Sequence, residues 1–575
     1  MAPLLSSSGR AAWFLAIMGG VTLGALVLAA VRAVPLKMLP FDNKNEFALV
    51  LDMDEGTTLE RTDAVVRDME QYLTRVPEVT DFVSYVGVPA PVDFNGLVRH
   101  YYLRHAPHLA EIRVNLVAKK RRALQSHGLV LRLHDDLAAI AQRHGGRLRL
   151  VEIPPGPPVL AGIVAEIYGQ PDHSYQDLLA AAETVAERMR AEPGLVDIDD
   201  TREAPQTKWV FVVDQEKAAL HGVSVEEIAQ TVALISSGAA AGTLQAPAER
   251  QPLVIQLRLP RAERSSPTDL ARVRVKSAAG HLVPLAELGQ WRTTRVDQTI
   301  YHKNLERIVY VFAEAAGRTP AECVVDLMAD RRAQHELEPL GYAEAVGSGY
   351  ILRARPRFLS ERSYLRPGGG IPWSVPEGIR ITFAGEGEWD ITLDVFRDLG
   401  LAFLAALAMI YIILVAQTKS FVLPLIVMLA IPLTIPGVLP GFWALNALAG
   451  QVVGGYADPV YFTATAMIGM IALAGIVTRD AIILVDFIGL AVARGRPLED
   501  AILESRVVRL RPILLTASAA MLASLPITID PIFSGLGWSI IFGLVASTVF
   551  TMFVIPVVYW LLYRRRSQPA QKGAS

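Results

Sequence analysis

The stretch "LAGIVTRDAIILVDF", Leu473–Phe487, places three charged residues inside an apolar run that extends from about 460 to 493. A charged side chain at the centre of a membrane-spanning helix costs at least about 3 kcal/mol when it faces lipid. Arg479 and Asp486 are seven residues apart and so share one helix face, and Asp480 lies about 100° around from Arg479. The pattern therefore predicts a membrane helix that is packed inside a bundle of helices.

The three charges allow two interpretations. In the first, the helix leaves the membrane early, so that Asp486 lies at the interface and Arg479 extends its side chain towards the surface. In the second, Arg479, Asp480 and Asp486 form a buried cluster that takes up and releases protons, as in proton-driven transporters. Burial raises the pKa of a carboxyl group and a nearby cation lowers it, so a carboxylate that alternates between these settings can carry a proton. We favour the second interpretation, because the residues after Arg479 are mostly apolar.

The composition indicates a membrane protein and excludes several other classes. Hydrophobic residues make up 52% of the 575 residues, and Lys plus Arg (55) nearly balances Asp plus Glu (57), so nothing indicates a nucleic-acid partner. The single cysteine, Cys323, excludes an intrachain disulfide framework and a cysteine-rich zinc site. The sequence contains no G-x-x-x-x-G-K-[ST] loop, so ATP is not the expected energy source. We therefore predict no cofactor, no metal site and no enzymatic activity.

Six apolar segments are long enough to cross a membrane. The first, 11–31, has no charged residue and can span about 30 Å of hydrocarbon as a helix. A signal peptide is the alternative, but its apolar core is usually nearer 7–15 residues. Three prolines four residues apart, Pro432, Pro436 and Pro440, predict a bend or break in the third segment. The other five segments are approximately 393–416, 421–445, 460–493, 510–529 and 536–563.

The distribution of Lys and Arg predicts that both termini lie in the cytoplasm. The short loops 446–459 and 530–535, which would lie on the opposite side, contain neither residue. Residues 35–390 are then expected outside the cytoplasm, in the periplasm. The predicted cytoplasmic segments contain Arg10, Lys419, Arg494, Arg496, Arg506, Arg509, Arg511 and Arg564 to Arg566.

Residues 35–390 alternate between strand-like and helix-like segments, which predicts α+β subdomains. The strand "EFALVLDMD", from residue 46, precedes the amphipathic helix "TTLERTDAVVRDMEQYLTRV", and a similar unit recurs about 116 residues later. The predicted parts are a first transmembrane helix (1–34), an α+β subdomain (35–160), a second α+β subdomain (161–390) with an insertion at about 203–300, a five-helix transmembrane bundle (391–566) and a cytoplasmic tail (567–575).

Four segments together resemble the resistance–nodulation–division (RND) efflux transporters of Gram-negative inner membranes. They are the opening stretch, "RVVRLRPILLTASAAMLASLPI" after it, "VVDQEKAALHGVSVEEI" and "PLKMLPFDNKNEFALVLDMDEGTTLERT". The resemblance covers nearly the whole chain. It implies an α+β membrane protein with a large periplasmic region of ferredoxin-like subdomains between the first and second of six helices. RND transporters have twelve spans in two similar halves, and this chain resembles spans seven to twelve, the C-terminal half.

The resemblance also implies roles for single residues. Arg479 stands where the family has a basic residue, commonly Lys, that contacts an aspartate pair in the fourth span, and Asp480 stands where Asn is common. Thr516 and Arg509 match a relay Thr and a relay-associated Arg of the eleventh span. Because Arg does not deprotonate in practice, Arg479 would be a fixed charge and the carboxylates would carry the proton. A local pair between Arg479 and Asp480 is the alternative to a pair between helices.

The expected function is that of a half-subunit of a proton-coupled RND pump that exports amphiphilic or drug-like compounds. The expected partners are the complementary N-terminal half, which would supply the aspartates, further copies in a trimer, a periplasmic adaptor, an outer-membrane channel and membrane lipid. Two alternatives stay open: export of metal cations, and a non-transporting sensor or assembly factor. The aperiodic segment "ILRARPRFLSERSYLRPGGGIPWSVPEG", 351–378, is either an ordered interaction loop or a mobile linker.

Overall fold

The computed structural model describes residues 1–250, 252–338 and 343–564, which form two compact units. One unit is Met1–Arg202 with Ile300–Ser575, and the other is Glu203–Thr299. The predicted cytoplasmic tail, 567–575, and the last two residues of the predicted five-helix bundle lie outside the described residues.

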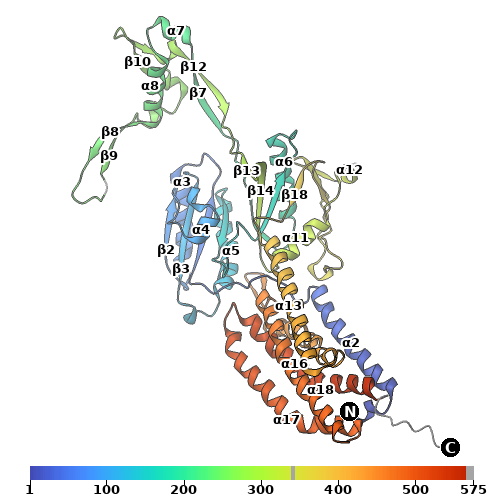
Figure 1. Ribbon diagram of the computed structural model, residues 1–575. Coiled ribbons are helices and arrows are strands. Elements are labelled where there is room, and N and C mark those ends of the chain that lie inside the picture. The colour runs from blue at the N-terminus through green and yellow to red at the C-terminus, as the bar shows by residue number, and fades with distance from the viewer. Residues whose placement is uncertain (251, 339–342, 565–575) are drawn as a thin grey trace, which may run out of the picture. The chain divides into compact units, whose positions relative to one another are not determined.

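Six of the described helical segments are long and apolar enough to cross a membrane, which confirms the predicted number (Figure 1). Their mean hydropathy over 18 residues is between 1.8 and 2.7. They are α2 (Ser8–Ala30), α13 (Glu388–Thr418), α14 (Leu423–Met428) continued by α15 (Ile435–Ala449), α16 (Ala464–Ala493), α17 (Leu498–Ser524) and α18 (Ser534–Tyr563).

Two of these spans have features that need a closer description: a break in the third and an earlier start of the fifth. The third span is broken, as the prolines predict: α14 ends at Met428, a 3₁₀ turn covers Pro432–Thr434, and α15 then begins. The fifth span begins at Leu498 rather than near residue 510, because buried residues continue at helical spacing through this region and acidic residues occupy its first turn. Arg506 and Arg509, which precede the predicted span, therefore lie within α17, as does Arg511.

Small residues let α18 pack closely against its neighbours α15, α16 and α17. The positions are four residues apart, so they form one stripe along the helix, and all are buried. A side chain larger than Ser or Thr would keep the helices apart, as in other membrane bundles. The stripe consists of Gly535, Ser539, Gly543, Ser547 and Thr551.

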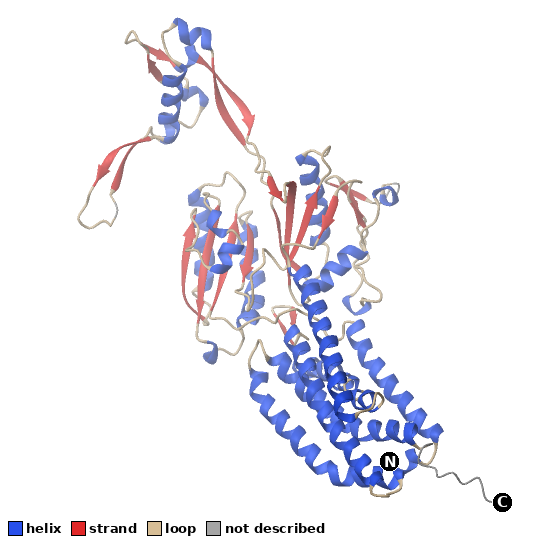
Figure 2. Cartoon of the chain, viewed as in Figure 1, coloured by secondary structure: helices blue, strands red, loops and turns tan. Residues whose placement is uncertain are grey.

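The first extramembrane subdomain is a four-stranded antiparallel sheet in the order β2-β3-β1-β4, covered by helices (Figure 2). Its chain order, strand–helix–strand–strand–helix–strand, is that of a split β-α-β sheet. Apolar residues from the sheet and from α3 and α5 form its core. The elements are β1 (Glu46–Asp52), α3 (Leu59–Leu73), β2 (Val79–Val86), β3 (Leu109–Leu116), α5 (Ser126–Arg143) and β4 (Arg147–Val151).

The second subdomain has a five-stranded sheet in the order β13-β14-β5-β18, with β6 also paired to β14. A small second sheet, β15-β16-β17, packs against α6. These findings confirm a sheet-rich α+β region between the first two spans. The elements are β5 (Ile163–Tyr168), α6 (Tyr175–Arg190), β6 (Leu195–Asp200), β13 (Tyr301–Lys303), β14 (Glu306–Ala315), α11 (Pro320–Ala329), β15 (Glu344–Val346), β16 (Gly349–Ile351), β17 (Trp373–Ser374) and β18 (Arg380–Thr382).

A buried group of charges, which we call the charged cluster, joins the end of α2 to this second subdomain. Arg32, just after α2, donates two hydrogen bonds of 2.8 and 3.0 Å to Asp326 on α11. Burial alone would raise the pKa of Asp326, but its hydrogen bonds with Arg32 and Arg362 hold the pKa well below its usual range. The charged cluster consists of Arg32, Arg188, Glu192, Arg318, Asp326, Asp330 and Arg362.

The separate unit, Glu203–Thr299, has its own small apolar core between helices and short strands. Ser224 caps α8 reciprocally with Glu227, which the sequence "SVEE" favours. Its larger elements are β7 (Thr207–Val213), α7 (Gln215–Leu220), α8 (Val225–Ser237), β8 (Ala239–Leu244), β9 (Leu253–Leu257) and β12 (Gly289–Arg295).

Candidate functional site

The charged stretch lies in the middle of α16, and its three charges are divided between two faces of the helix. Asp480 belongs to the face that packs into the bundle and is 5% exposed. Arg479 and Asp486 share an adjoining face that is exposed, and the side chain of Arg479 is 53% exposed. The six helices therefore bury one charge of the three.

Within the six described helices Asp480 is buried and Arg479 and Asp486 are exposed, so these helices alone do not form the predicted buried cluster of three charges. The seven-residue spacing correctly placed Arg479 and Asp486 on one face, but spacing does not reveal whether a neighbouring helix covers that face. Arg479 Nε lies 3.7 Å from Asp480 Oδ1, an ion-pair distance that is too long for a hydrogen bond. Within the described residues Asp480 Oδ1 has no hydrogen-bond partner. The structure contains the local pair of Arg479 and Asp480, which was the alternative interpretation of the sequence.

The two relay candidates on α17 do not join the charges of α16. The guanidinium carbon of Arg509 lies 5.1 Å from the ring centre of Phe487, next to Asp486 in sequence. The exposed Thr516 hydroxyl donates a 3.0 Å hydrogen bond to the carbonyl oxygen of Ile513, within its own helix. In the described parts of the chain, no hydrogen bond or ion pair connects Arg509 or Thr516 to Arg479, Asp480 or Asp486.

The sequence analysis missed a set of buried hydroxyl groups on α18. The side-chain oxygens of Ser539, Thr548 and Thr551 are buried and have no hydrogen-bond partner among the described residues. Ser539 faces α16 near Gly469. Hydroxyl groups without partners inside a membrane bundle can bind water molecules that conduct protons. The four-residue spacing of small residues from Gly535 to Thr551 was the signal that could have revealed this face.

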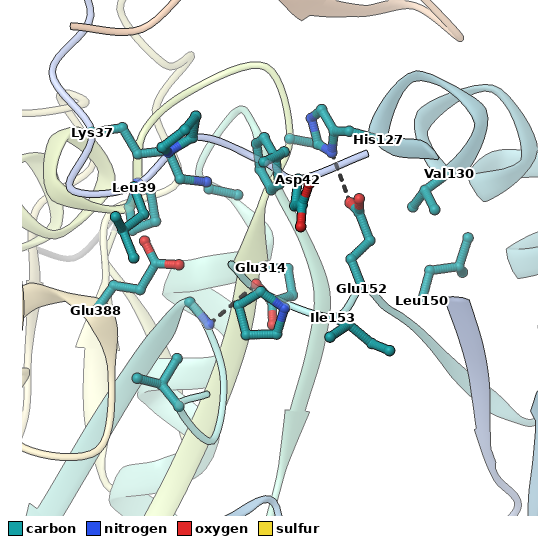
Figure 3. A pocket seen from close by; sticks show the side chains of 18 of the residues that line it. Lys37, Leu39, Asp42, His127, Val130, Leu150, Glu152, Ile153, Glu314 and Glu388 are labelled. Carbon is teal, nitrogen blue, oxygen red and sulfur yellow. Dashed lines mark hydrogen bonds and ion pairs between the residues drawn. The ribbon is translucent and has the colours of Figure 1, made fainter. Parts of the chain in front are cut away.

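Outside the membrane, a cavity of about 110 Å³ lies where the two α+β subdomains meet the linker after α2. Pro, Val, Leu and Ile side chains make up much of its wall. Asp42, Glu314 and Glu388 surround the space together with Lys37 (Figure 3). A pocket for a drug-sized ligand has a volume of roughly 300–1,000 Å³, so the cavity is smaller than such a pocket in this structure.

Two polar groups of the cavity are held in place by specific contacts. Burial raises the pKa of Glu314, whose Oε2 accepts a 3.1 Å hydrogen bond from the backbone of Gly162, and Arg99 at 3.7 Å opposes that rise. His127 pairs with Glu152 at 2.7 Å and stacks on Phe41 with ring centres 3.4 Å apart (Figure 3). The cavity therefore combines apolar walls with the carboxyl group of Glu314, whose raised pKa favours its neutral form.

Hydrogen bonds and ion pairs connect the two subdomains beside this cavity. His134 on α5 contacts Asp197 on β6 at 2.7 Å, and Arg147 on β4 contacts Asp199 on β6 at 3.0 Å. Burial would lower the pKa of His134, but hydrogen bonds to Asp197 and Asp135 outweigh burial and raise it from 6.5 to about 9. His134 is therefore protonated at neutral pH and forms a charged contact across the cleft.

The described residues contain no group of three or more His, Cys, Asp or Glu side chains arranged to hold a metal ion. His100, His105 and His108, which are close in sequence, belong to an irregular polar segment.

Two curated proteins named for resistance are similar in sequence to this chain. "Nickel-cobalt-cadmium resistance protein NccA" of Alcaligenes xylosoxydans xylosoxydans is 26% identical over 427 residues, 72% of this chain and 34% of that protein. "Multidrug resistance protein MdtC" of Cronobacter sakazakii is 25% identical over 389 residues, 66% of this chain and 32% of that protein. The chain thus spans about a third of the length of these curated relatives.

A solved structure has the same fold. The crystal structure of a heavy metal efflux pump superimposes with a TM-score of 0.71 over 98% of this chain and 50% of that chain, at 18% sequence identity.

The sequence model of the AcrB/AcrD/AcrF family matches residues 2–347 and 372–563, so that only 348–371 inside the match are unmatched. This match, the six membrane helices and the extramembrane α+β region agree with one another. The chain therefore belongs to the AcrB/AcrD/AcrF family of RND efflux permeases, which are transporters rather than enzymes.

Proposed function

We propose that this chain supplies the C-terminal half of a proton-coupled RND exporter and that membrane helices other than these six cover the exposed face of α16. The exposure of Arg479 and Asp486 in the middle of an apolar span carries the proposal. A face with these charges is costly in lipid, at least about 3 kcal/mol for each charge at mid-depth. Helices with carboxylates of their own would remove that cost.

In the proposed mechanism, Arg479 is a fixed positive charge and carboxylates around it change protonation. Asp480, already buried beside Arg479, is available as a proton carrier together with aspartates of the covering helices. The hydroxyl groups of α18 would bind the water molecules that lead protons to this position. Asp486, Arg509 and Thr516 would join the relay when the covering helices are present.

The proposed topology places both termini in the cytoplasm and residues 35–390 in the periplasm, in the inner membrane of a Gram-negative cell. The proposed domains have the boundaries predicted from the sequence. The two α+β subdomains are ferredoxin-like, and residues 203–300 form a docking-like subdomain inserted in the second. A trimeric assembly, a periplasmic adaptor and an outer-membrane channel complete the proposed export route.

The proposed cargo is an amphiphilic organic compound that binds when the cleft between the two α+β subdomains opens. Apolar walls with a few carboxyl groups suit such a compound. A metal cation is the second candidate, because NccA and the superimposed pump are named for metals. The described residues offer no preformed metal-binding group, which favours the organic compound.

The test is export from cells that contain this chain together with a polypeptide bearing the complementary six spans. We expect efflux of the fluorescent amphiphilic cation ethidium, and its loss in the Arg479→Gln variant without loss of membrane insertion. Arg494→Gln is the matched control, because Arg494 is exposed at the end of α16, and it should export normally. Efflux of Ni²⁺ or Co²⁺ instead of ethidium would show that the cargo is a metal cation and not an organic compound. No efflux of either, with the complex intact, would favour a sensor or assembly factor.

A further inference from the structure

Residues 352–371 form an insert in the hairpin between the paired strands β16 and β17. The ends of the insert meet, since the backbone N–H of Leu352 donates a 2.9 Å hydrogen bond to the carbonyl of Pro372. The insert falls within 348–371, the internal segment that the family model does not match. Its function therefore does not follow from family membership.

The charged cluster holds the insert in one position. Arg362 of the insert is fully buried and contacts Glu192 and Asp326. The glycines at the other end pass directly over the cluster: Gly368 has φ +104°, and a Cβ atom there would lie 2.6 Å from Asp330 Oδ1. The sequence left open whether this segment is an ordered loop or a mobile linker, and these contacts are those of an ordered loop.

The insert lies beside the end of α2 (Figure 1). The backbone N–H of Tyr364 donates a 2.9 Å hydrogen bond to the carbonyl of Ala30, the last residue of α2. The guanidinium carbon of Arg32 lies 4.8 Å from the ring centre of Tyr364. With 23 residues, α2 is about 34 Å long, close to the thickness of the hydrocarbon core of a bilayer. The end of α2, and with it the insert, is thus placed at a membrane surface.

The outer side of the insert exposes large apolar side chains that the rest of the described unit does not cover. Phe358 is 59% exposed, Leu359 is 44% exposed and Leu365 is 79% exposed. The guanidinium carbon of Arg355 lies 5.1 Å from the ring centre of Phe358, and Arg366 is exposed next to Leu365. Aromatic and aliphatic side chains flanked by Arg are typical of segments that lie in the interface of an anionic bilayer.

We propose that the insert is an interfacial anchor: Phe358, Leu359 and Leu365 enter the leaflet at the end of α2, and Arg355 and Arg366 contact the phosphate groups of anionic lipids. One acidic residue, Glu361, lies between them, so the exposed charge of this side is positive. The anchor fixes the second α+β subdomain to the membrane surface through the charged cluster. The proposal depends on α2 spanning the membrane and not on export, so it can fail while the proposed function stands.

The test measures the depth of Leu365 in the full chain reconstituted into bilayer nanodiscs of phosphatidylcholine and phosphatidylglycerol. A nitroxide label on Leu365→Cys reports collisions with oxygen, which is enriched in the bilayer, and with a water-soluble nickel chelate. The native Cys323 is fully buried, and burial raises its pKa to about 12, so the introduced cysteine is labelled selectively at neutral pH. We expect the ratio of oxygen to nickel collisions at Leu365 to be several-fold higher than at a water-exposed site.

Two further labelling positions serve as controls. Leu305→Cys is the matched exposed position, because Leu305 is 98% exposed in the turn between β13 and β14. Val21→Cys, on the exposed face of α2, reports a lipid-facing position. A nickel accessibility at Leu365 equal to that at Leu305, with Val21 in lipid, would overturn the proposal. Protection of Leu365 from both reagents, with spin–spin broadening, would also overturn it by showing contact with a second copy.

The charges are tested with the double variant Arg355→Gln/Arg366→Gln in the Leu365→Cys background. We expect this variant to raise nickel accessibility at Leu365 several-fold in nanodiscs with phosphatidylglycerol and to have little effect in pure phosphatidylcholine. Equal behaviour in both lipids would remove the anionic-lipid part of the proposal. The variant changes exposed side chains, so a folding defect is not expected.

Discussion

Replacing His134 by Gln should weaken the closed state of the cleft between the two α+β subdomains at neutral pH. His134 Nε2 lies 2.7 Å from Asp197 Oδ1 and its Nδ1 lies 2.8 Å from Asp135 Oδ1. Asp197 also accepts a 3.0 Å hydrogen bond from the backbone N–H of Leu150 on β4. Loss of the imidazolium therefore leaves Asp197 with a neutral partner in place of a charged one.

The size of the effect follows from the pKa of His134, which the closed structure raises from 6.5 to about 9. At 1.36 kcal/mol for each pKa unit, this difference corresponds to at most about 3 kcal/mol for the cleft, because Asp135 lies next to His134 on α5 and stays beside it when the subdomains separate. Because the pKa is raised in the closed state, the stabilisation is fully present below pH 6.5 and is lost as the pH rises through about 9. The side chain is 12% exposed, so solvent screening reduces this value little.

Hydrogen–deuterium exchange of the Leu150 amide, corrected for its intrinsic pH dependence, measures the opening of the cleft. In the wild type, protection should fall by up to roughly 100-fold between pH 6.5 and 9.5. His134→Gln should have low protection throughout and should lose the pH dependence. His144→Gln is the matched control: its 2.9 Å contact with Asp68 is on the surface, so protection should stay within about threefold of the wild type. An unchanged pH dependence in His134→Gln would refute the assignment.

Two further predictions concern packing and buried charge. A Cβ at Gly437 would lie 2.2 Å from the carbonyl oxygen of Phe542, so Gly437→Ala should cost about 1–3 kcal/mol and lower the thermal unfolding temperature in detergent, whereas Gly475→Ala, with no atom within 4 Å, should not. Arg188→Met leaves buried carboxylates without their cation and should cost about 3–5 kcal/mol, while Arg397→Met, at a side chain 62% exposed, should be close to neutral in the same assay.

The features that depend on local sequence were predictable. Apolar segments of about twenty residues or more identified all six spans, because the bilayer requires that length. The prolines at 432, 436 and 440 predicted a bend or break in the third span, because proline removes backbone hydrogen bonds, and the break lies between α14 and α15 while Pro440 is inside α15. The alternation of strands and helices predicted the α+β region for the same local reasons.

The features that depend on neighbours were not predictable. The spacing of Arg479 and Asp486 defined a shared face, but its exposure depends on which helices pack beside α16. The charges of Arg506 and Arg509 obscured the first turns of α17, since composition alone resembled a cytoplasmic loop. Arg362 was one of many arginines in an aperiodic segment, and its burial depends on carboxylates far away in sequence.

The charged cluster also determines how much the burial of Arg362 costs. Burial raises the pKa of the neighbouring Glu322 and favours its neutral form, so the cluster sets four guanidinium groups against three carboxylates. Without Arg362 the balance would be three against three. Arg362 therefore brings one additional positive charge into a set that is balanced without it, and it places that charge against Glu192 and Asp326. Removing any one of the three carboxylates would increase the excess of buried positive charge, so such a substitution is expected to destabilise the second subdomain more than the loss of Arg362 does.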